Sequence, residues 1–391
     1  MKAIHPSERM SRIPPYFFAK LGLRIAELRA EGVDVIRVDM GSPDLPPAPP
    51  IIESLIESAK RNDVHGYAPF GGPESFRKAV AAYYDRRFGV RLDPKDQILG
   101  LVGSKEGLFN LTQAMVDPGD VVLVPDPGYP VYSSSAEFAG AEVIRMPLRA
   151  ENGFLPDFSA LASETLERVR LMWLNYPNNP TGATADLAFF QEVVDLAARY
   201  GFLVAHDAPY TEVCFDGYVA PSLLQVPDAT QVAVEFNSLS KAYNMAGWRV
   251  GMALGNPTAI GALGTLKSQM DTSQFTPIWA AGTAALTGDQ SWLEERNAVY
   301  EERRDLVLDA LATIGMQAPA PKAALYVWAP LPKGEASSAA FCERLLAETG
   351  VSVTPGVAFG SEGEGYVRIS LGTNTDRMAE AMARLKAWQP A

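Results

Sequence analysis

Short runs of apolar residues recur along the first three quarters of the chain, and most of them end in Pro, Gly, Asp or Asn. One intervening segment, 187–201, carries apolar residues at spacings of three and four and ends in glycine, which predicts an amphipathic helix. Continuous apolar strands that alternate with helices indicate a mainly parallel sheet covered on both faces. We therefore expect an α/β fold with buried strands at 120–128, 141–148, 170–177, 202–210, 231–236 and 248–255.

The pattern changes after residue 287. Residues 291–315 predict one long helix, and strand-like "ALYVWAPL", helix-like "SSAAFCERLLAETG" and strand-like "GYVRISLG" follow it. A single core rarely exceeds about 250–300 residues, and this chain has 391. We expect an N-terminal arm that packs with the small domain, a large domain and a smaller α+β domain, with limits at 1–44, 45–287 and 288–391.

Composition narrows the class of protein. Hydrophobic residues make up 47% and charged residues 20%, which is ordinary for a soluble globular chain. The net charge of −12, with no block of basic residues, disfavours a nucleic-acid partner. The two cysteines, Cys214 and Cys342, have no CxxC spacing, so we expect neither a disulfide framework nor a cysteine-based zinc site, and no metal. With no signal-like stretch and no run near ~20 apolar residues, a cytoplasmic protein is expected.

Polar side chains follow several of the predicted strands. Because ligands bind beyond the carboxyl ends of strands in an open α/β sheet, these side chains are expected to converge on one crevice. Each has a simpler explanation by itself: Asp207 can cap a turn, "NYPNNPTG" can be a rigid turn, and Lys241 can lie on the surface. The serines can cap helices. Together, however, these separate explanations would require all of the polar groups to meet at the strand ends by chance. The set consists of Ser104, Lys105, Asn178, Asn179, Asp207, Tyr210, Ser238, Ser240 and Lys241.

One cofactor needs all of these groups. A phosphate is held by hydroxyls, backbone N–H groups and a cation. An aldehyde forms a Schiff base with an amine, and a pyridine ring that accepts electrons needs a carboxylate at its nitrogen. A phenolate on that ring needs amide and hydroxyl donors. Pyridoxal 5′-phosphate (PLP) combines these features, while the motifs GxGxxG, GxxxxGK[ST], HExxH and GxSxG are absent from the sequence.

At these residues the chain resembles class I/II, fold type I PLP-dependent aminotransferases. The resemblance lies in "NYPNNPTG", "HDAPY" and "SLSKAYNMAGWRVG" and extends from "GSPD" to "YVRISLG". The spacings also fit, with 28 residues from Asn179 to Asp207, 34 from Asp207 to Lys241, and 8 from Lys241 to Arg249. The resemblance implies a large domain with a mainly parallel sheet, a small α+β domain and a homodimer with shared active sites.

The family's residue roles carry over by position. The resemblance implies that Lys241 binds PLP covalently, that Asp207 pairs with the ring nitrogen, and that Asn179 and Tyr210 hold the phenolic oxygen, with Lys241, Asp207 and Tyr210 as the catalytic set. Tyr129 stacks on the ring, and Tyr67 reaches the phosphate of the partner subunit. Arg368 clamps the substrate carboxylate, with Gly41 and Asn179 beside it. The phosphate group is expected to contact Ser104, Lys105, Ser238, Ser240 and Arg249.

Three positions have competing interpretations. The family pattern has small residues and Thr where this chain has Lys105 and Glu106, so the role of Lys105 is left open. Thr276 either contributes to the active site of the neighbouring subunit or has a purely structural role. His206 precedes Asp207 on the same strand and should face the opposite way, as a supporting or core histidine.

The implied reaction is a ping-pong transfer of an α-amino group from an L-amino acid to a 2-oxo acid, commonly 2-oxoglutarate. "LVPDPGYPVY" and "LNYPNNPTGA" are similar to LL-diaminopimelate aminotransferases and related succinyl-diaminopimelate enzymes, which suggests a role in lysine biosynthesis. "YNMAGWRVG" is equally similar to bacterial alanine aminotransferases. We favour diaminopimelate, with alanine or another L-amino acid as the alternative substrate. A PLP-dependent β-lyase is a further alternative.

Overall fold

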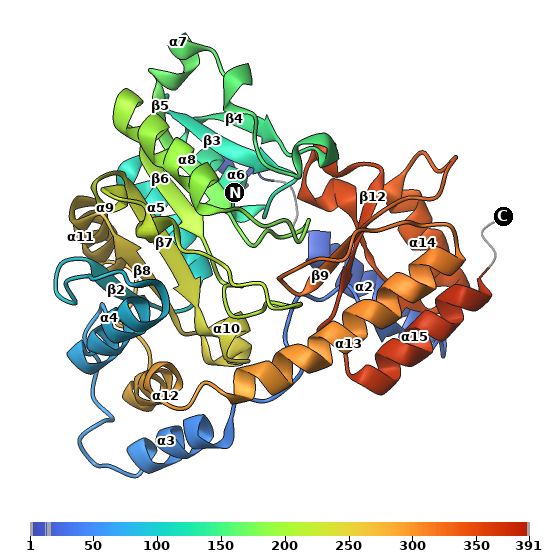
Figure 1. Cartoon of the computed structure of the whole chain (residues 1–391), viewed down its shortest axis with the longest axis horizontal. Coiled ribbons are helices and arrows are strands. Elements are labelled where there is room, and N and C mark those ends of the chain that lie inside the picture. Colours follow the sequence, from blue (N-terminus) through green and yellow to red (C-terminus); the bar gives the residue numbers. More distant parts are fainter. Residues whose placement is uncertain (1–2, 12, 14–16, 389–391) are drawn as a thin grey trace.

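A seven-stranded sheet forms the centre of the larger part of the molecule (Figure 1). The computed structural model describes residues 3–11, 13 and 17–388. Strand pairs β4/β3, β3/β5, β5/β6 and β6/β7 are parallel, whereas β8 is antiparallel to both of its neighbours. The expected mainly parallel α/β sheet is thus confirmed. Its order is β2 (Ile98–Leu101), β8 (Gly251–Gly255), β7 (Ala233–Ser238), β6 (Leu203–Asp207), β5 (Val169–Asn175), β3 (Val121–Asp126) and β4 (Glu142–Pro147).

Helices cover both faces of this sheet, because alternate residues of each strand point to opposite sides. In β3, Val122 and Val124 enter one hydrophobic core, whereas Val121 and Leu123 enter the other. The first core is completed by α5 (Ser104–Met115), α6 (Val131–Ala139) and α11 (Pro257–Lys267). The second is completed by α3 (Pro49–Ala59), α4 (Glu74–Phe88), α8 (Leu187–Tyr200) and α12 (Thr276–Thr287).

A smaller antiparallel sheet lies beside the first, at the far end of the long helix α13 (Trp292–Thr313) (Figure 1). Its order is β11 (Thr354–Pro355), β12 (Tyr366–Ser370) and β9 (Tyr326–Pro330), and α13 and two further helices, α14 (Ser338–Thr349) and α15 (Thr375–Ala387), accompany it. The N-terminal segment joins this part through β1 (Ile36–Arg37), which pairs with β10 (Val351–Ser352). The domain limits at 44/45 and 287/288 stay predictions.

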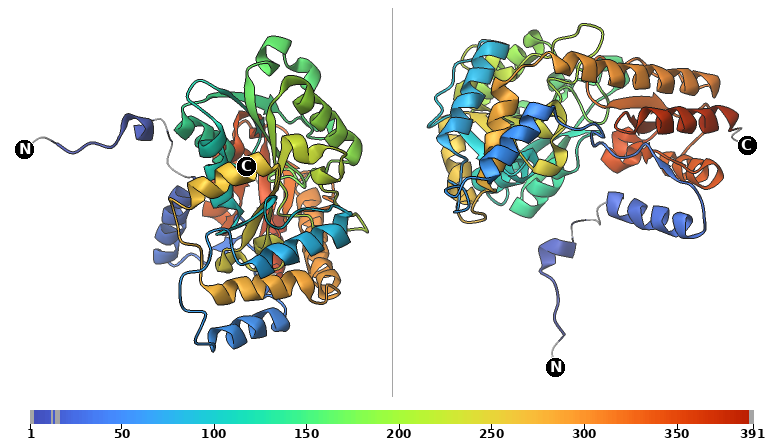
Figure 2. Two further views of the ribbon diagram at one scale, coloured as in Figure 1. Left: turned by 90° about the vertical axis from the view of Figure 1, so that its left-hand side faces the viewer. Right: turned by 90° about the horizontal axis from the view of Figure 1, so that it is seen from below.

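Part of the N-terminal segment reaches outward. Helix α2 (Phe17–Ala30) packs Ile25 and Leu28 against Leu346 of α14, whereas α1 (Glu8–Ser11) stands away from the rest of the molecule in both views of Figure 2. The other short α-helices are α7 (Ser163–Leu166), α9 (Ala229–Val232) and α10 (Leu239–Ala242).

Two predicted strands begin too early in the sequence. Residues 231 and 232 belong to helix α9, so β7 begins at Ala233. The run at 248–255 also starts with a turn, because the 3₁₀ helix Ala246–Trp248 is followed by Arg249 at φ 59°. A residue in the left-handed region cannot continue a strand, so β8 begins at Gly251.

Over the described residues, the structure contains no helix with the length and apolar character that a membrane crossing requires. The cytoplasmic location stays a prediction.

Candidate active site

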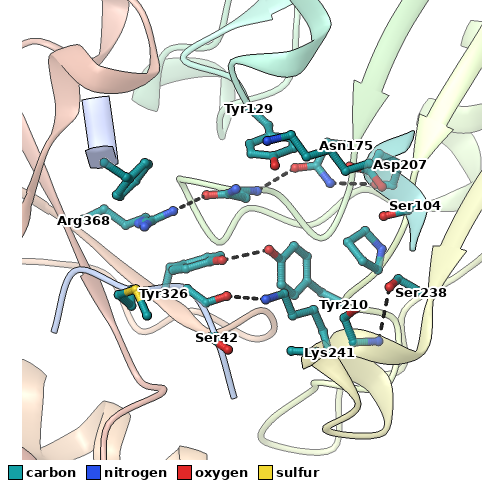
Figure 3. Close-up of a pocket in the computed structure, with 18 of the residues that line it drawn as sticks. Ser42, Ser104, Tyr129, Asn175, Asp207, Tyr210, Ser238, Lys241, Tyr326 and Arg368 are labelled. Carbon is teal, nitrogen blue, oxygen red and sulfur yellow. Dashed lines mark hydrogen bonds between the residues drawn. The ribbon is translucent and has the colours of Figure 1, made fainter. Parts of the chain in front are cut away.

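A pocket of about 380 Å³ opens where the carboxyl ends of the central strands face the smaller sheet (Figure 3). This is where an α/β sheet binds ligands. Most of the predicted site residues line it: Gly41, Ser104, Lys105, Tyr129, Asn179, Asp207, Tyr210, Ser238, Ser240, Lys241, Arg249 and Arg368. Tyr67 is not among the described residues that line it and is 91% exposed. Its predicted contact with a partner subunit stays a prediction.

Lys241 lies on α10, the short helix that follows β7 directly. The helix begins there because the Ser238 side chain accepts a hydrogen bond from the Ser240 amide. The Lys241 amine donates to the carbonyl of Gly41. Burial, and then the positive charges of Arg368 and Arg249, lower the pKa of Lys241 to about 8. This lysine can therefore become a neutral amine at modest cost.

Asp207 is the last residue of β6 and is buried. Its Oδ2 accepts a hydrogen bond of 2.8 Å from the Tyr132 hydroxyl, while Oδ1 has no hydrogen-bond partner among the described residues. Burial raises the pKa of Asp207 to about 6, although the Tyr132 hydrogen bond and the charge of His206 act to lower it. A buried carboxylate oxygen without a donor costs about 1–3 kcal/mol, so this arrangement favours a ligand that brings an N–H group.

Arg368 lies on β12, in the smaller sheet, and its described hydrogen bonds go to neutral oxygens. It donates to Asn179 Oδ1 at 2.8 Å and to the Asp39 carbonyl at 2.7 Å. The guanidinium carbon lies over the Tyr326 and Phe359 rings, 4.3 and 4.6 Å from their centroids. A buried guanidinium with this neutral surrounding is suited to an anionic carboxylate.

The opposite end of the pocket forms a polar cradle at the N-terminus of α5. Gly103 has φ 75° and lies so close to Arg249 that a Cβ there would stand 2.1 Å from Nη2. Arg249 also donates to Ala246 O at 2.8 Å and to Ser240 Oγ at 3.4 Å. Hydroxyls, a helix N-terminus and a guanidinium together favour a phosphate group.

Lys105, the second residue of α5, and Tyr129 also line the pocket. The Lys105 amine is 5.8 Å from the centroid of the Tyr129 ring. Burial, and then the charge of Arg249, lower the pKa of Lys105. The structure thus brings Lys105 into the pocket, and its role stays a prediction.

Among the residues that contribute to the site without having been predicted are Asn175, Tyr132 and Tyr326. Asn175, the last residue of β5, donates to the Asp207 carbonyl at 2.6 Å and accepts from the Asn179 amide at 2.7 Å. Its place at a strand end was a signal that could have found it. Tyr132 and Tyr326 gave no such signal, because Tyr132 lies inside α6 and Tyr326 belongs to the smaller sheet.

His206 faces away from the pocket. Its Nδ1 lies 2.9 Å from Glu235 Oε2, and its Nε2 lies 3.0 Å from the Tyr176 carbonyl oxygen. It therefore supports the strands behind Asp207 and does not line the pocket among the described residues.

Comparisons with known proteins identify the family to which the chain belongs. The family model for aminotransferase class I and II matches residues 33–385. The LL-diaminopimelate aminotransferase of Moorella thermoacetica is 49% identical over 380 residues, 97% of each chain. The substrate-bound structure of BacF from Bacillus subtilis superposes with a TM-score of 0.94 at 37% identity and covers 99% of this chain and 98% of that one. A probable N-succinyldiaminopimelate aminotransferase from Thermus thermophilus has a TM-score of 0.89 at 35% identity, over 95% of this chain and 99% of that one.

The family match covers most of the chain, and the relatives are similar over nearly their whole length. Enzymes of this family transfer amino groups and in general depend on PLP. This chain belongs to the class I and II aminotransferases.

Proposed function

We propose that this aminotransferase uses PLP to move an amino group from LL-diaminopimelate to a 2-oxo acid, with 2-oxoglutarate as the acceptor. The observation that carries the PLP assignment is the open Oδ1 atom of buried Asp207, in the same pocket as Lys241. An N–H group of a pyridinium ring would satisfy this oxygen. Asp207 and Lys241 are thus suited to opposite ends of one reactive ligand.

The other residues of the pocket fit the remaining groups of PLP. Asn179 and Tyr210 would hold the phenolic oxygen, and Tyr129 would cover one face of the ring. Its phosphate would bind in the cradle of Ser104, Lys105, Ser238, Ser240 and Arg249.

Each reacting residue has a separate task. When bound, PLP supplies an aldehyde that an amine can attack and a ring that accepts the electron pair left at the substrate α-carbon. Lys241 holds the cofactor and, as a free neutral amine, takes the α-proton and returns it. Asp207 stays ionised above its pKa of about 6 and so keeps the ring nitrogen protonated. Arg368 binds the α-carboxylate and fixes the α-carbon near Lys241.

The substrate assignment is supported by the relatives. Several curated proteins at 45–49% identity over 97–98% of this chain are named LL-diaminopimelate aminotransferase. The test is a panel of amino donors with 2-oxoglutarate and with pyruvate. We expect kcat/KM for LL-diaminopimelate to exceed that for L-alanine and L-glutamate by at least about 100-fold, equivalent to about 2.7 kcal/mol of discrimination.

Two other outcomes would replace this proposal. A higher kcat/KM for alanine would make the chain an alanine aminotransferase. Release of ammonia and pyruvate from one amino acid, with no 2-oxo acid required, would indicate a β-lyase.

We also propose a homodimer that shares its active sites. The support is an exposed aromatic surface: Tyr67 is 91% exposed, and Phe70 and Phe275 are 45% and 43% exposed. The His65 and Phe275 rings lie 5.6 Å apart in the same region. Light scattering should give twice the chain mass of 42.2 kDa. Tyr67→Phe should weaken PLP binding although Tyr67 lies outside its own pocket, and unchanged PLP affinity would contradict shared sites.

A further inference from the structure

Tyr326 is a buried tyrosine that reaches from the smaller sheet into the pocket, at the first position of β9 (Figure 3). Its hydroxyl lies 2.8 Å from the Tyr210 hydroxyl, and the two rings meet edge to face with centroids 5.6 Å apart. The guanidinium of Arg368 lies over the same ring, 4.3 Å from its centroid. One side chain therefore contacts both the phenol beside Lys241 and the carboxylate-binding arginine.

We propose that Tyr326 is a positioning residue with two separable functions. Its hydroxyl directs the proton of Tyr210 into the pocket, and its ring holds the guanidinium of Arg368 in place. This inference rests on the proposed PLP-dependent function and assigns a new residue to the same site.

The first function follows from counting protons. Burial, and then the neighbouring Tyr326, raise the pKa of Tyr210 well above its usual value, so Tyr210 stays a neutral phenol with one proton. If Tyr210 gave that proton to Tyr326, it would have none for the phenolic oxygen of PLP. If Tyr326 donates instead, the Tyr210 proton is free, and each proton has an acceptor. A donor that itself accepts a hydrogen bond also donates more strongly.

The second function follows from the packing around the ring. A Cβ at Gly41 would lie 2.2 Å from the Tyr326 hydroxyl oxygen, so the phenol rests directly on the backbone at Gly41. The carbonyl of Gly41 accepts the hydrogen bond of Lys241. Tyr326 is thus fixed on one side by Gly41 and Tyr210, and its face is available to Arg368.

The test separates the hydroxyl from the ring. The proton that bound PLP shares between its phenolic oxygen and the lysine nitrogen is titrated by visible absorbance, and its pH midpoint reports on donors to that oxygen. Weakening the hydrogen bond that Tyr210 donates to the ionised oxygen raises the pKa, so Tyr326→Phe should raise the midpoint by about 0.5–1 pH unit. KM for the amino acid should change by less than about twofold, because the ring beneath Arg368 remains. Tyr326→Leu removes the ring as well, so it should shift the midpoint and also raise KM for the amino acid about tenfold.

A double-mutant cycle shows whether Tyr326 acts through Tyr210. Tyr210→Phe should raise the midpoint at least as much as Tyr326→Phe, and the double variant should match Tyr210→Phe alone. The control is Tyr366→Phe, a tyrosine of the same small sheet that stacks on Trp328 and is not among the described residues lining the pocket. This variant should keep the wild-type midpoint.

An unchanged midpoint in Tyr326→Phe would overturn the role of the hydroxyl, and fully additive shifts would overturn its action through Tyr210. An unchanged KM in folded Tyr326→Leu would overturn the role of the ring. These failures are distinct from failure of the proposed function. A wild-type protein that binds no PLP would overturn both proposals, whereas one that binds PLP and transaminates would leave the proposed function intact.

Discussion

His206 and Asp207 are neighbours on β6, yet they belong to two regions of opposite character. Behind the pocket, Oε1 of Glu235 accepts hydrogen bonds from the hydroxyls of Tyr84 and Ser222. Oε2 of Glu235 accepts one from the Leu223 amide and lies 2.9 Å from His206 Nδ1. At the pocket, Asp207 has one oxygen satisfied by Tyr132 and one without a partner among the described residues.

This difference separates structure from function. A buried polar group that serves stability is normally paired, because an unpaired one lowers the free energy of unfolding. The pocket contains two such unpaired atoms, Asp207 Oδ1 and Arg368 Nε. Both are buried and have no hydrogen-bond partner within the described ranges. A bound ligand can satisfy them. Substitutions behind the pocket should therefore act on stability, and substitutions at the pocket on ligand binding and turnover.

The largest effect is expected at Lys241. Lys241→Ala should lower transamination by at least about 10⁴-fold, because it removes the amine that moves the α-proton. It should also abolish covalent PLP, measured by borohydride reduction and mass spectrometry. Lys78→Ala, at an exposed position of α4, is the matched control and should behave as wild type. Covalent PLP that persists in Lys241→Ala would place the reactive amine elsewhere.

The next effect should appear in the region behind the pocket. Glu235→Gln should lower the free energy of unfolding by about 3 kcal/mol, because it removes the charge from a buried network of donors. The measurement is the denaturant midpoint, with Glu57→Gln in an exposed ion pair as the control that leaves it unchanged. PLP affinity should stay near that of wild type. A normal stability with lost PLP binding would contradict the division between the two regions.

Arg368 should show the reverse behaviour. Arg368→Lys should raise KM for both the amino acid and the 2-oxo acid by about 10–100-fold, because an ammonium cannot bind a carboxylate with two parallel hydrogen bonds. Bound PLP, followed by its visible absorbance, should be retained. Arg377→Lys, a partly exposed arginine on α15, is the matched control. If both KM values stay unchanged, another residue holds the carboxylate.

The smallest effect is a dependence on pH. Lys241 attacks an aldehyde only as a neutral amine, and its pKa is about 8. The rate of covalent PLP attachment to the apo-protein should therefore fall about tenfold for each pH unit below 8 and level off above it. Stopped-flow absorbance gives this profile. Arg368→Leu removes a positive charge and should move the midpoint upward, and a rate independent of pH would contradict the lowered pKa.

Much of the site could be predicted from the sequence, because polar residues that directly follow apolar strands lie at one edge of a parallel sheet. Asp207, Asn179 and Lys241 were predicted for this reason. The strand β2 was not among the predicted strands, and two strand limits were wrong where local conformation changed within an apolar run. Residues 231 and 232 form a helical turn, and Arg249 adopts positive φ, so the strands begin later than hydrophobicity suggests.

The sequence by itself determined six of the seven strands of the larger sheet, all but β2, together with the set of chemical groups at the strand ends and the family resemblance. These properties depend on spacing over a few residues or on motifs that can be recognised in a single sequence. Only the tertiary structure decided which oxygen of Asp207 is open, how Arg368 is enclosed, and that Tyr326 meets Tyr210 across 116 residues of sequence. Such contacts depend on how the smaller sheet packs against the larger one, and no local pattern of polar and apolar residues encodes that geometry.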